Sequence, residues 1–107
     1  GKQTRTMTYV DDIVNGIITI LENESKYTVI NITTEEITSV FDMINISKNI
    51  TGNNVECEHI KDREGQIYEE MIHSKRLQSL GWKAETTFKE GMIKSYDYYL
   101  NNNNKFN

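Results

Sequence analysis

Apolar residues along the chain change their spacing several times, and each change marks a predicted element. The β-branched stretches 6–10 and 27–32 predict strands. Residues 27–32 are apolar at both alternating sets of positions, which is typical of a strand inside a sheet. Residues 55–60 alternate in character and predict a third strand, after a turn at 51–54.

Two longer helices are predicted in the first half of the chain, where apolar residues recur three and four positions apart. The first covers residues 13–21, with Asp11 or Asp12 as its N-cap, and a polar stretch ends it. The second covers residues 37–50, where Ser39 begins an approximate capping box that the acidic residue three positions later completes.

Two more helices are predicted near the C-terminus. Residues 74–80 form a short one that Gly81 closes, because glycine takes the left-handed conformation at helix ends without strain. Thr87 and Glu90 form a capping box that starts the last helix. The buried stripe of this helix is predicted to consist of Phe88, Met92, Tyr96 and Tyr99.

The resulting order of elements is strand, helix, strand, helix, strand, helix, helix, which predicts an α/β lobe with about three short strands and four helices. Residues 1–107 are expected to form this single lobe, with 101–107 as a frayed polar tail. Three short strands offer little sheet to four amphipathic helices, so we expect apolar surface that a partner lobe covers.

Composition narrows the classes of partner. The 107 residues carry 12 Lys and Arg against 16 Asp and Glu, a net charge of −4 without any basic cluster, which argues against nucleic-acid binding. No apolar run approaches the roughly 20 residues of a membrane-spanning helix, so we expect no membrane partner. Cys57 is the single cysteine, which excludes an internal disulfide and fits the cytoplasm.

Motifs for cofactor binding and catalysis are missing from the sequence. The six glycines never reach the G-x-G-x-x-G spacing that holds a dinucleotide pyrophosphate, and no tyrosine has a lysine four positions later. His59 and His73 stand apart from any nucleophile pattern, and one cysteine with two histidines is a poor set of zinc ligands. We therefore expect no catalytic residue, no bound cofactor and no metal in this chain.

Several short sequences recur in an order that resembles a known family. They resemble the C-terminal, substrate-binding portion of the extended short-chain dehydrogenase/reductases, also called the NAD-dependent epimerase/dehydratase family. The greatest similarity is to the 4,6-dehydratases of dTDP-glucose and UDP-glucose, with the sugar-nucleotide 4-epimerases as close relatives. The matching sequences are Gly-Lys-Gln-Thr-Arg at 1–5, Tyr-Val-Asp-Asp at 9–12, Val-Ile-Asn-Ile at 29–32, Asp-Arg-Glu-Gly at 62–65, Leu-Gly-Trp at 80–82 and Phe-Lys-Glu-Gly at 88–91.

The resemblance implies that the complete protein is roughly three times as long. Its N-terminal Rossmann lobe would hold NAD and supply the catalytic tyrosine and lysine, and this smaller lobe would hold the nucleotide diphosphate of the substrate. The missing motifs would then belong to the N-terminal lobe. A cytoplasmic enzyme is implied, and a homodimer is one expected state of the full-length protein.

The resemblance also assigns site residues. Arg5 matches the arginine that reaches the substrate pyrophosphate, and Arg63 matches the arginine of the D-R-x-G loop, which makes a second phosphate or a ribose contact. Gln66 lies where the family has Asn or His beside the nucleotide. A guanidinium suits this role because it stays ionised and its donors match two phosphate oxygens at once. The alternative is that the arginines only cover the surface or pair with Asp11 or Glu64.

The remaining motif residues are expected to be structural. Asp12 would cap a helix, Asn31 would tie a strand end to a loop, and Trp82 would fill the gap between the short helix and the last one. The chain departs from the family pattern at four positions. Glu64 and Ala84 stand where the family usually has proline, Ile67 stands where it often has an acidic residue, and Thr33 stands where glycine is common.

Two functional hypotheses follow. The chain is the nucleotide-sugar-binding part of an NAD-dependent 4,6-dehydratase or 4-epimerase, or it is a small non-enzymatic binding or interaction module that keeps the fold of this lobe.

Overall fold

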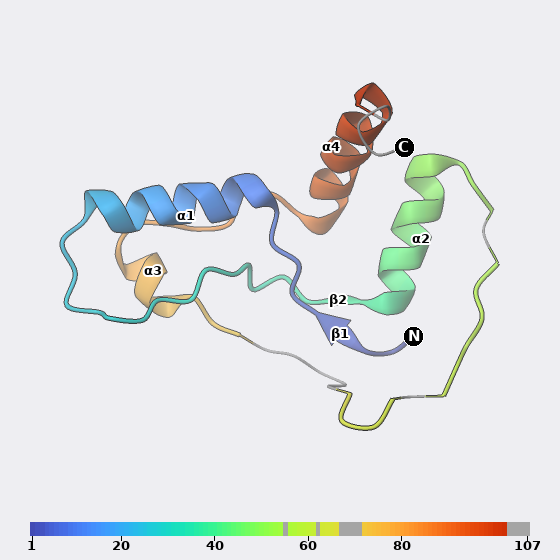
Figure 1. Cartoon of the computed structure of the whole chain (residues 1–107), viewed down its shortest axis with the longest axis horizontal. Coiled ribbons are helices and arrows are strands. Elements are labelled where there is room, and N and C mark those ends of the chain that lie inside the picture. The colour runs from blue at the N-terminus through green and yellow to red at the C-terminus, as the bar shows by residue number, and fades with distance from the viewer. Residues whose placement is uncertain (55, 62, 67–71, 103–107) are drawn as a thin grey trace.

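The computed structural model of the chain describes residues 1–54, 56–61, 63–66 and 72–102. It confirms an α/β lobe with four helices (Figure 1). The elements in chain order are β1 (Thr4–Arg5), α1 (Val10–Glu22), β2 (Thr38–Ser39), α2 (Val40–Thr51), α3 (Lys75–Ser79) and α4 (Phe88–Asn101).

The strands differ most from the sequence prediction. β1 and β2 form one antiparallel pair, with Thr4 opposite Ser39 and Arg5 opposite Thr38. The predicted strand at 6–10 is wrong, because β1 ends at Arg5 and Val10 is already helical. The predicted strand at 27–32 is not formed either. The third predicted strand, 55–60, is not formed over 56–60, and residue 55 lies outside the described residues. A strand needs a neighbour to pair with, and the described residues offer none to these segments.

The helices follow the prediction closely, because their signals are local. Ser39 accepts a hydrogen bond from the Asp42 N–H at 3.1 Å, and Thr87 accepts one from the Glu90 N–H at 3.2 Å, so both predicted N-caps are confirmed. Gly81 follows α3 with φ of 97°, the left-handed conformation expected there. The predicted N-cap of α1 is wrong, since the helix begins at Val10 after Tyr9, without a side-chain cap.

Asp12 instead joins α1 to the chain that precedes α4. Its carboxylate accepts hydrogen bonds from the N–H groups of Glu85 at 3.2 Å and Thr86 at 3.0 Å. The Trp82 indole N–H donates to the Asp12 carbonyl at 3.0 Å, so the buried Trp82 side chain lies against α1. Trp82 is therefore a packing residue as expected, but it packs on α1 and not only between the last two helices.

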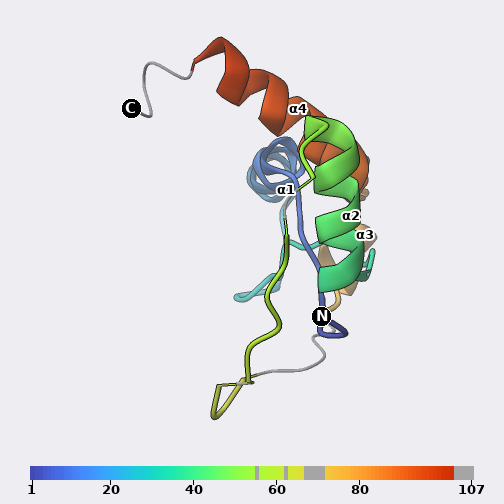
Figure 2. The ribbon, with the colours of Figure 1, turned by 90° about the vertical axis from the view of Figure 1, so that its right-hand side faces the viewer.

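The chain is extended for its size. Its radius of gyration is 16.5 Å and its extents are 49 × 37 × 22 Å, whereas about 13 Å is typical of a compact domain of this length. α1 packs with α3 at one end of the molecule, and the β1–β2 pair with α2 and α4 lies at the other (Figure 1). Figure 2 views the molecule from the end that carries α2, with α1 farther back. Leu77 and Trp82 are the buried apolar residues among those described, so the core is small.

Hydroxyl groups join these two ends. Ser74 is 1% exposed, and its Oγ accepts from the Thr33 N–H at 2.8 Å and donates to the Thr33 carbonyl. Thr8 Oγ1 accepts from the Thr34 N–H at 2.9 Å. Asn31 Nδ2 donates to the His73 carbonyl at 3.4 Å, which ties this segment to a loop as predicted.

The predicted buried stripe of α4 is only partly buried. Phe88, Met92 and Tyr96 are half-buried, but Tyr99 is 46% exposed. Gly91 is the buried residue of this helix. The helix approaches Tyr9 closely there, since a Cβ added to Gly91 would lie 3.1 Å from the Tyr9 ring. Asn101 ends the helix, and the predicted frayed tail beyond residue 102 lies outside the described residues.

Candidate diphosphate-binding pocket

The three residues assigned to substrate binding line one pocket. Arg5, Arg63 and Gln66 surround a cavity of about 300 Å³, which β1, the start of α2 and the described residues of the segment 57–66 enclose. Arg5 and Arg63 are 58 positions apart in the sequence, so only the tertiary fold can bring them to the same cavity.

The β1–β2 pair positions Arg5. Because Arg5 lies opposite Thr38, directly before α2, its side chain is held next to the first turn of that helix. The guanidinium Nη1 donates to the Thr4 carbonyl at 2.7 Å, and the residue is half-buried. This anchoring restricts the long side chain, so less conformational entropy would be lost on binding an anion.

A tight turn positions Arg63. The Gln66 N–H donates to the Arg63 carbonyl at 3.1 Å, and Gly65 adopts φ of 78°, which a side chain would strain. The Gln66 side chain closes the turn, since its Oε1 accepts from the Arg63 N–H at 3.2 Å. Gln66 thus holds the backbone of Arg63 while it lines the pocket.

The pairings named in the alternative do not occur between the described residues. No salt bridge joins Arg5 or Arg63 to Asp11 or Glu64 there, and a contact between His73 Nδ1 and Glu35 Oε1 at 3.1 Å lies elsewhere. Arg63 is exposed at the pocket, so its donors are accessible to a ligand.

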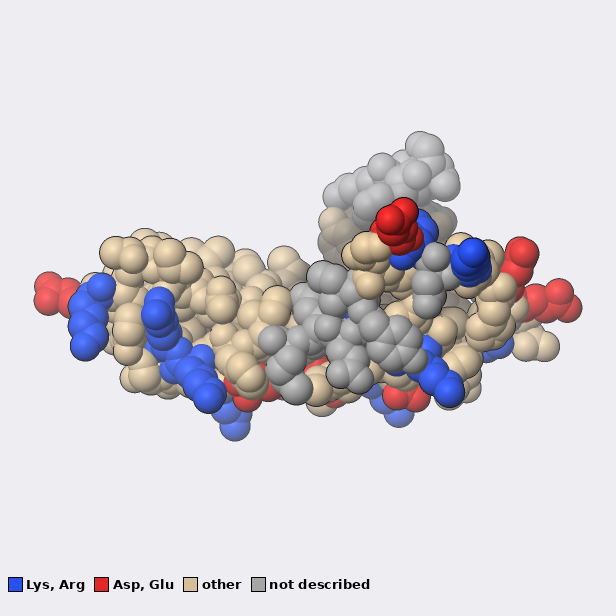
Figure 3. Space-filling model, turned by 90° about the horizontal axis from the view of Figure 1, so that it is seen from below, with Lys and Arg blue, Asp and Glu red and all other residues tan. Residues whose placement is uncertain are grey.

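The pocket is locally positive on an acidic chain. Lys61 is a third cation in its lining and Glu58 is the one carboxylate among the described lining residues, which leaves a surplus of two positive charges. The whole chain carries −4. Figure 3 shows one face of the molecule, with Lys and Arg on both halves and Asp and Glu beside several of them. The described lining residues therefore bring three cations together on a chain that is acidic as a whole.

Sequence reasoning missed the other described lining residues, among them Cys57, Glu58, His59, Ile60 and Lys61. The His59 ring lies against Phe41 of α2, with centroids 5.6 Å apart and ring planes tilted by 52°. Because residues 57–61 line the pocket consecutively, no periodic pattern in the sequence could have identified them.

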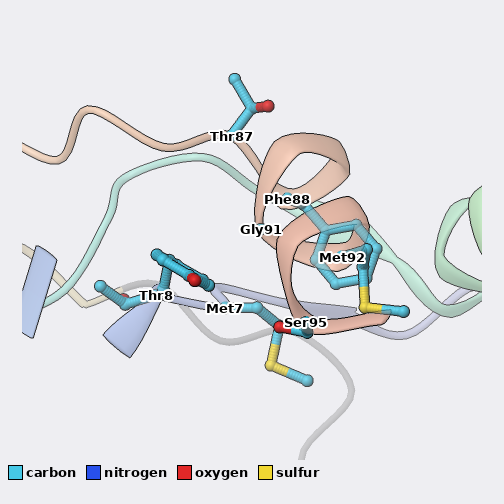
Figure 4. Close-up of a pocket in the computed structure, with 8 residues that line it drawn as sticks. Met7, Thr8, Thr87, Phe88, Gly91, Met92 and Ser95 are labelled. Atoms are coloured by element: carbon cyan, nitrogen blue, oxygen red, sulfur yellow. The ribbon is translucent and has the colours of Figure 1, made fainter. Parts of the chain in front are cut away.

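A second hollow, of about 220 Å³, lies between residues 7–9 and the start of α4. Figure 4 shows the side chains of Met7, Phe88 and Met92 around it. None of its described lining residues is charged, so it does not suit a phosphate.

The N-termini of α1, α2 and α4 do not suit the pyrophosphate of NAD. Acidic residues stand in the first turn of each long helix, Asp11 and Asp12 in α1, Asp42 in α2 and Glu90 in α4. A carboxylate there repels the anion that a helix N-terminus would otherwise attract. Within the described part of the chain, no group of His, Cys, Asp and Glu could hold a metal ion, and no helix has the length and apolar character to cross a membrane.

Comparisons with known proteins identify relatives of the chain. No protein-family model matches the chain. A protein of Methanocaldococcus jannaschii provisionally named UDP-glucose 4-epimerase is 35% identical over 103 residues, which are 96% of this chain and 33% of that protein. Human dTDP-D-glucose 4,6-dehydratase is 28% identical over 110 positions, covering 95% of this chain and 31% of that enzyme.

A solved structure is similar as well. UDP-glucuronic acid 4-epimerase from Bacillus cereus, in complex with UDP-glucuronic acid and NAD, matches with a TM-score of 0.84 and 27% identity, over 94% of this chain and 33% of that one. The chain spans about a third of the length of the relatives it matches, which agrees with a partial lobe. The relatives are nucleotide-sugar epimerases and dehydratases, and this chain belongs to the same NAD-dependent epimerase/dehydratase family of the extended short-chain dehydrogenase/reductases.

Proposed function

We propose that this chain is the nucleotide-sugar-binding part of an NAD-dependent 4-epimerase or 4,6-dehydratase, and that Arg5 and Arg63 hold the substrate diphosphate. The observation that carries the proposal is the meeting of these two arginines at one pocket of about 300 Å³. NAD and the groups that perform the reaction would be held by an N-terminal Rossmann lobe, and the protein would act in the cytoplasm.

The cations that line the pocket fit an anion with two negative charges better than a carboxylate with one. The diphosphate of a sugar nucleotide is esterified at both ends and carries two negative charges, equal to the surplus of two positive charges in the described lining. Arg5 and Arg63 approach from different segments, so each can bind one phosphate group through paired N–H donors. Lys61 adds charge without the planar donor geometry.

The arginines are expected to act in binding, with little effect on the chemical step. A diphosphate lies far from the sugar carbons that react, so contacts to it are shared by the ground state and the transition state. Gln66 contributes mainly by closing the turn that presents Arg63.

A non-enzymatic binding module is the alternative. It could use the same pocket, but the relatives of this chain are epimerases and dehydratases, and no observation favours a module without chemistry.

Calorimetric titration tests the proposal. The test protein is the two-lobe protein, defined as this chain joined at Gly1 to the lobe encoded ahead of it, titrated with UDP-glucose, dTDP-glucose and free uridine. Arg5→Ala and Arg63→Ala should each weaken sugar-nucleotide binding about 10- to 150-fold, the equivalent of about 1.5 to 3 kcal/mol for a charge-assisted hydrogen bond. Uridine, which lacks phosphate, should respond to neither substitution.

Arg76→Ala is the matched control, because it removes the same charge outside the pocket, where the Arg76 guanidinium donates to the Val29 carbonyl at 2.8 Å. Its affinity for the sugar nucleotides should equal that of the unaltered protein. Equal losses in all three variants would show a general charge effect and would refute a diphosphate site at Arg5 and Arg63.

A further inference from the structure

A group of hydroxyl side chains lies directly after Arg5. This hydroxyl cluster consists of Thr6 and Thr8 after β1, Thr33 and Thr34 before β2, and Ser74 before α3. Thr33 and Thr34 are 7% and 6% exposed, and Ser74 is 1% exposed. Backbone N–H groups at such buried positions need acceptors within the protein.

Hydroxyl oxygens of the cluster accept backbone N–H groups that carbonyls accept in a regular pair of strands. The Thr34 N–H donates to Thr8 Oγ1 at 2.9 Å, and the Thr33 N–H donates to Ser74 Oγ at 2.8 Å. The Thr33 Oγ1 also lies 3.2 Å from Thr6 Oγ1 and 3.4 Å from Thr8 Oγ1. Removal of the Thr8 hydroxyl would leave the buried Thr34 N–H without this acceptor, so the backbone would have to shift to satisfy it.

The cluster continues the antiparallel β1–β2 pair by means of side chains. Arg5 lies opposite Thr38, and three residues beyond Arg5 the Thr8 side chain meets Thr34. β1 and β2 contain two residues each, and so short a pair holds its register weakly on its own. The segment that carries Arg5 is therefore fixed at two points, by the backbone ladder before it and by the hydroxyl cluster after it.

Arg63 is held by a separate device. Its N–H and its carbonyl are both bonded to Gln66, in a turn that contains Gly65. The turn 63–66 contains no member of the hydroxyl cluster. The two arginines of the pocket thus depend on different parts of the chain for their positions.

We propose that Thr8 is a positioning residue for substrate binding, whose hydroxyl holds Arg5 in place at the diphosphate. This inference rests on the proposed function, which supplies the ligand of Arg5. Thr8 is not among the described residues that line the pocket of Arg5 and Arg63, so it acts through Arg5 and makes no contact of its own with the ligand.

The geometry of a guanidinium explains why its position matters. Paired N–H donors bind two phosphate oxygens only at short distances and nearly linear angles. A shift of the segment 5–8 would keep the positive charge of Arg5 near the pocket but lose the paired contact. The loss of affinity is therefore expected to be smaller than that of Arg5→Ala and to require the Arg5 side chain.

A double-mutant cycle tests this dependence. The two-lobe protein is titrated calorimetrically with UDP-glucose or dTDP-glucose, whichever the unaltered protein binds more tightly. Thr8→Val, which keeps the shape of the side chain without its hydroxyl, should weaken binding about 3- to 20-fold, within the range of residues coupled to one another. The same substitution should have no further effect in an Arg5→Ala background and its full effect in an Arg63→Ala background.

Three variants separate positioning from a general loss of stability. Thr8→Ser keeps the hydroxyl and should bind like the unaltered protein. Thr87→Val is the matched control, because it also removes a threonine hydroxyl that accepts a backbone N–H, from Glu90 at 3.2 Å, and it should leave the affinity unchanged. Thr6→Val is the milder variant, since the Thr6 hydroxyl bonds to another side chain, and it should show the same dependence on Arg5 if Thr8→Val does not fold.

The outcomes distinguish the positioning role from the diphosphate site. If Arg5→Ala weakens binding but Thr8→Val does not, only the positioning role is refuted. A loss from Thr8→Val that persists in the Arg5→Ala background, or an equal loss from Thr87→Val, also overturns it. If Arg5→Ala itself leaves the affinity unchanged, the diphosphate site is refuted and the positioning role falls with it.

Discussion

Asp12 provides a direct test of how α1 is joined to the segment that precedes α4. Its side chain is 3% exposed and accepts two backbone hydrogen bonds, from Glu85 and Thr86. Asp12→Asn keeps the shape of the side chain but replaces one acceptor oxygen with an NH2 group that faces a backbone N–H. One hydrogen bond is lost and two donors are opposed, which should lower the free energy of unfolding by about 1.5 to 3 kcal/mol.

Urea unfolding followed by circular dichroism measures this change. With a slope of about 1 to 2 kcal/mol per M for a domain of this size, the urea midpoint should fall by roughly 0.8 to 3 M. Asp11→Asn is the matched control, because exposed Asp11 lies in the same first turn and shares the favourable interaction with the helix dipole, worth about 0.3 to 1 kcal/mol. If the two variants shift the midpoint equally, the contact from Asp12 to residues 85–86 contributes nothing and the reasoning is wrong.

Three further outcomes are expected. Thr87→Ala should lower stability by about 1 kcal/mol through loss of the N-cap of α4, measured in the same urea experiment. Gly16→Val should cost about 1 to 3 kcal/mol, because even a Cβ there would lie 2.8 Å from Ile32 Cγ2, whereas Asn15→Val on the exposed neighbour should not. Titration of the chain alone with NAD should show no saturable binding, because the acidic residues at the helix N-termini repel a pyrophosphate. Saturable binding with a micromolar Kd would contradict this reasoning.

The helices were predictable because their determinants lie within a few residues of each other. Ser39 and Thr87 cap the helices that they were expected to cap, and Gly81 follows α3 as expected. Asp12 was misassigned for the same reason. A carboxylate near a helix start is the usual local cap, and its actual partners are more than 70 residues away.

The strands were not predictable in the same way, because a strand depends on its neighbours. The β-branched pattern of residues 27–32 is clear, yet the described chain supplies no edge to which it can pair. The pattern and the structure agree if the neighbouring strands belong to another part of the protein.

The three residues named from the sequence meet at one pocket, but the other residues that line it were not foreseen. Motif positions identified Arg5, Arg63 and Gln66, and the fold places all three at one pocket. Lys61 escaped notice because it carries no motif, and its proximity to Arg5 follows only from the path of the chain from α2 to the turn at 63–66.

Steady-state kinetics of the two-lobe protein test the central claim most directly. With UDP-glucose or dTDP-glucose as substrate, Arg5→Ala and Arg63→Ala should each raise KM about 10- to 150-fold with little change in kcat, because a diphosphate contact is shared by the ground and transition states. Arg5→Lys should recover only part of the loss, since an ammonium keeps the charge without the paired donors. An unchanged KM in both alanine variants would contradict the account and return Arg5 and Arg63 to the role of surface residues.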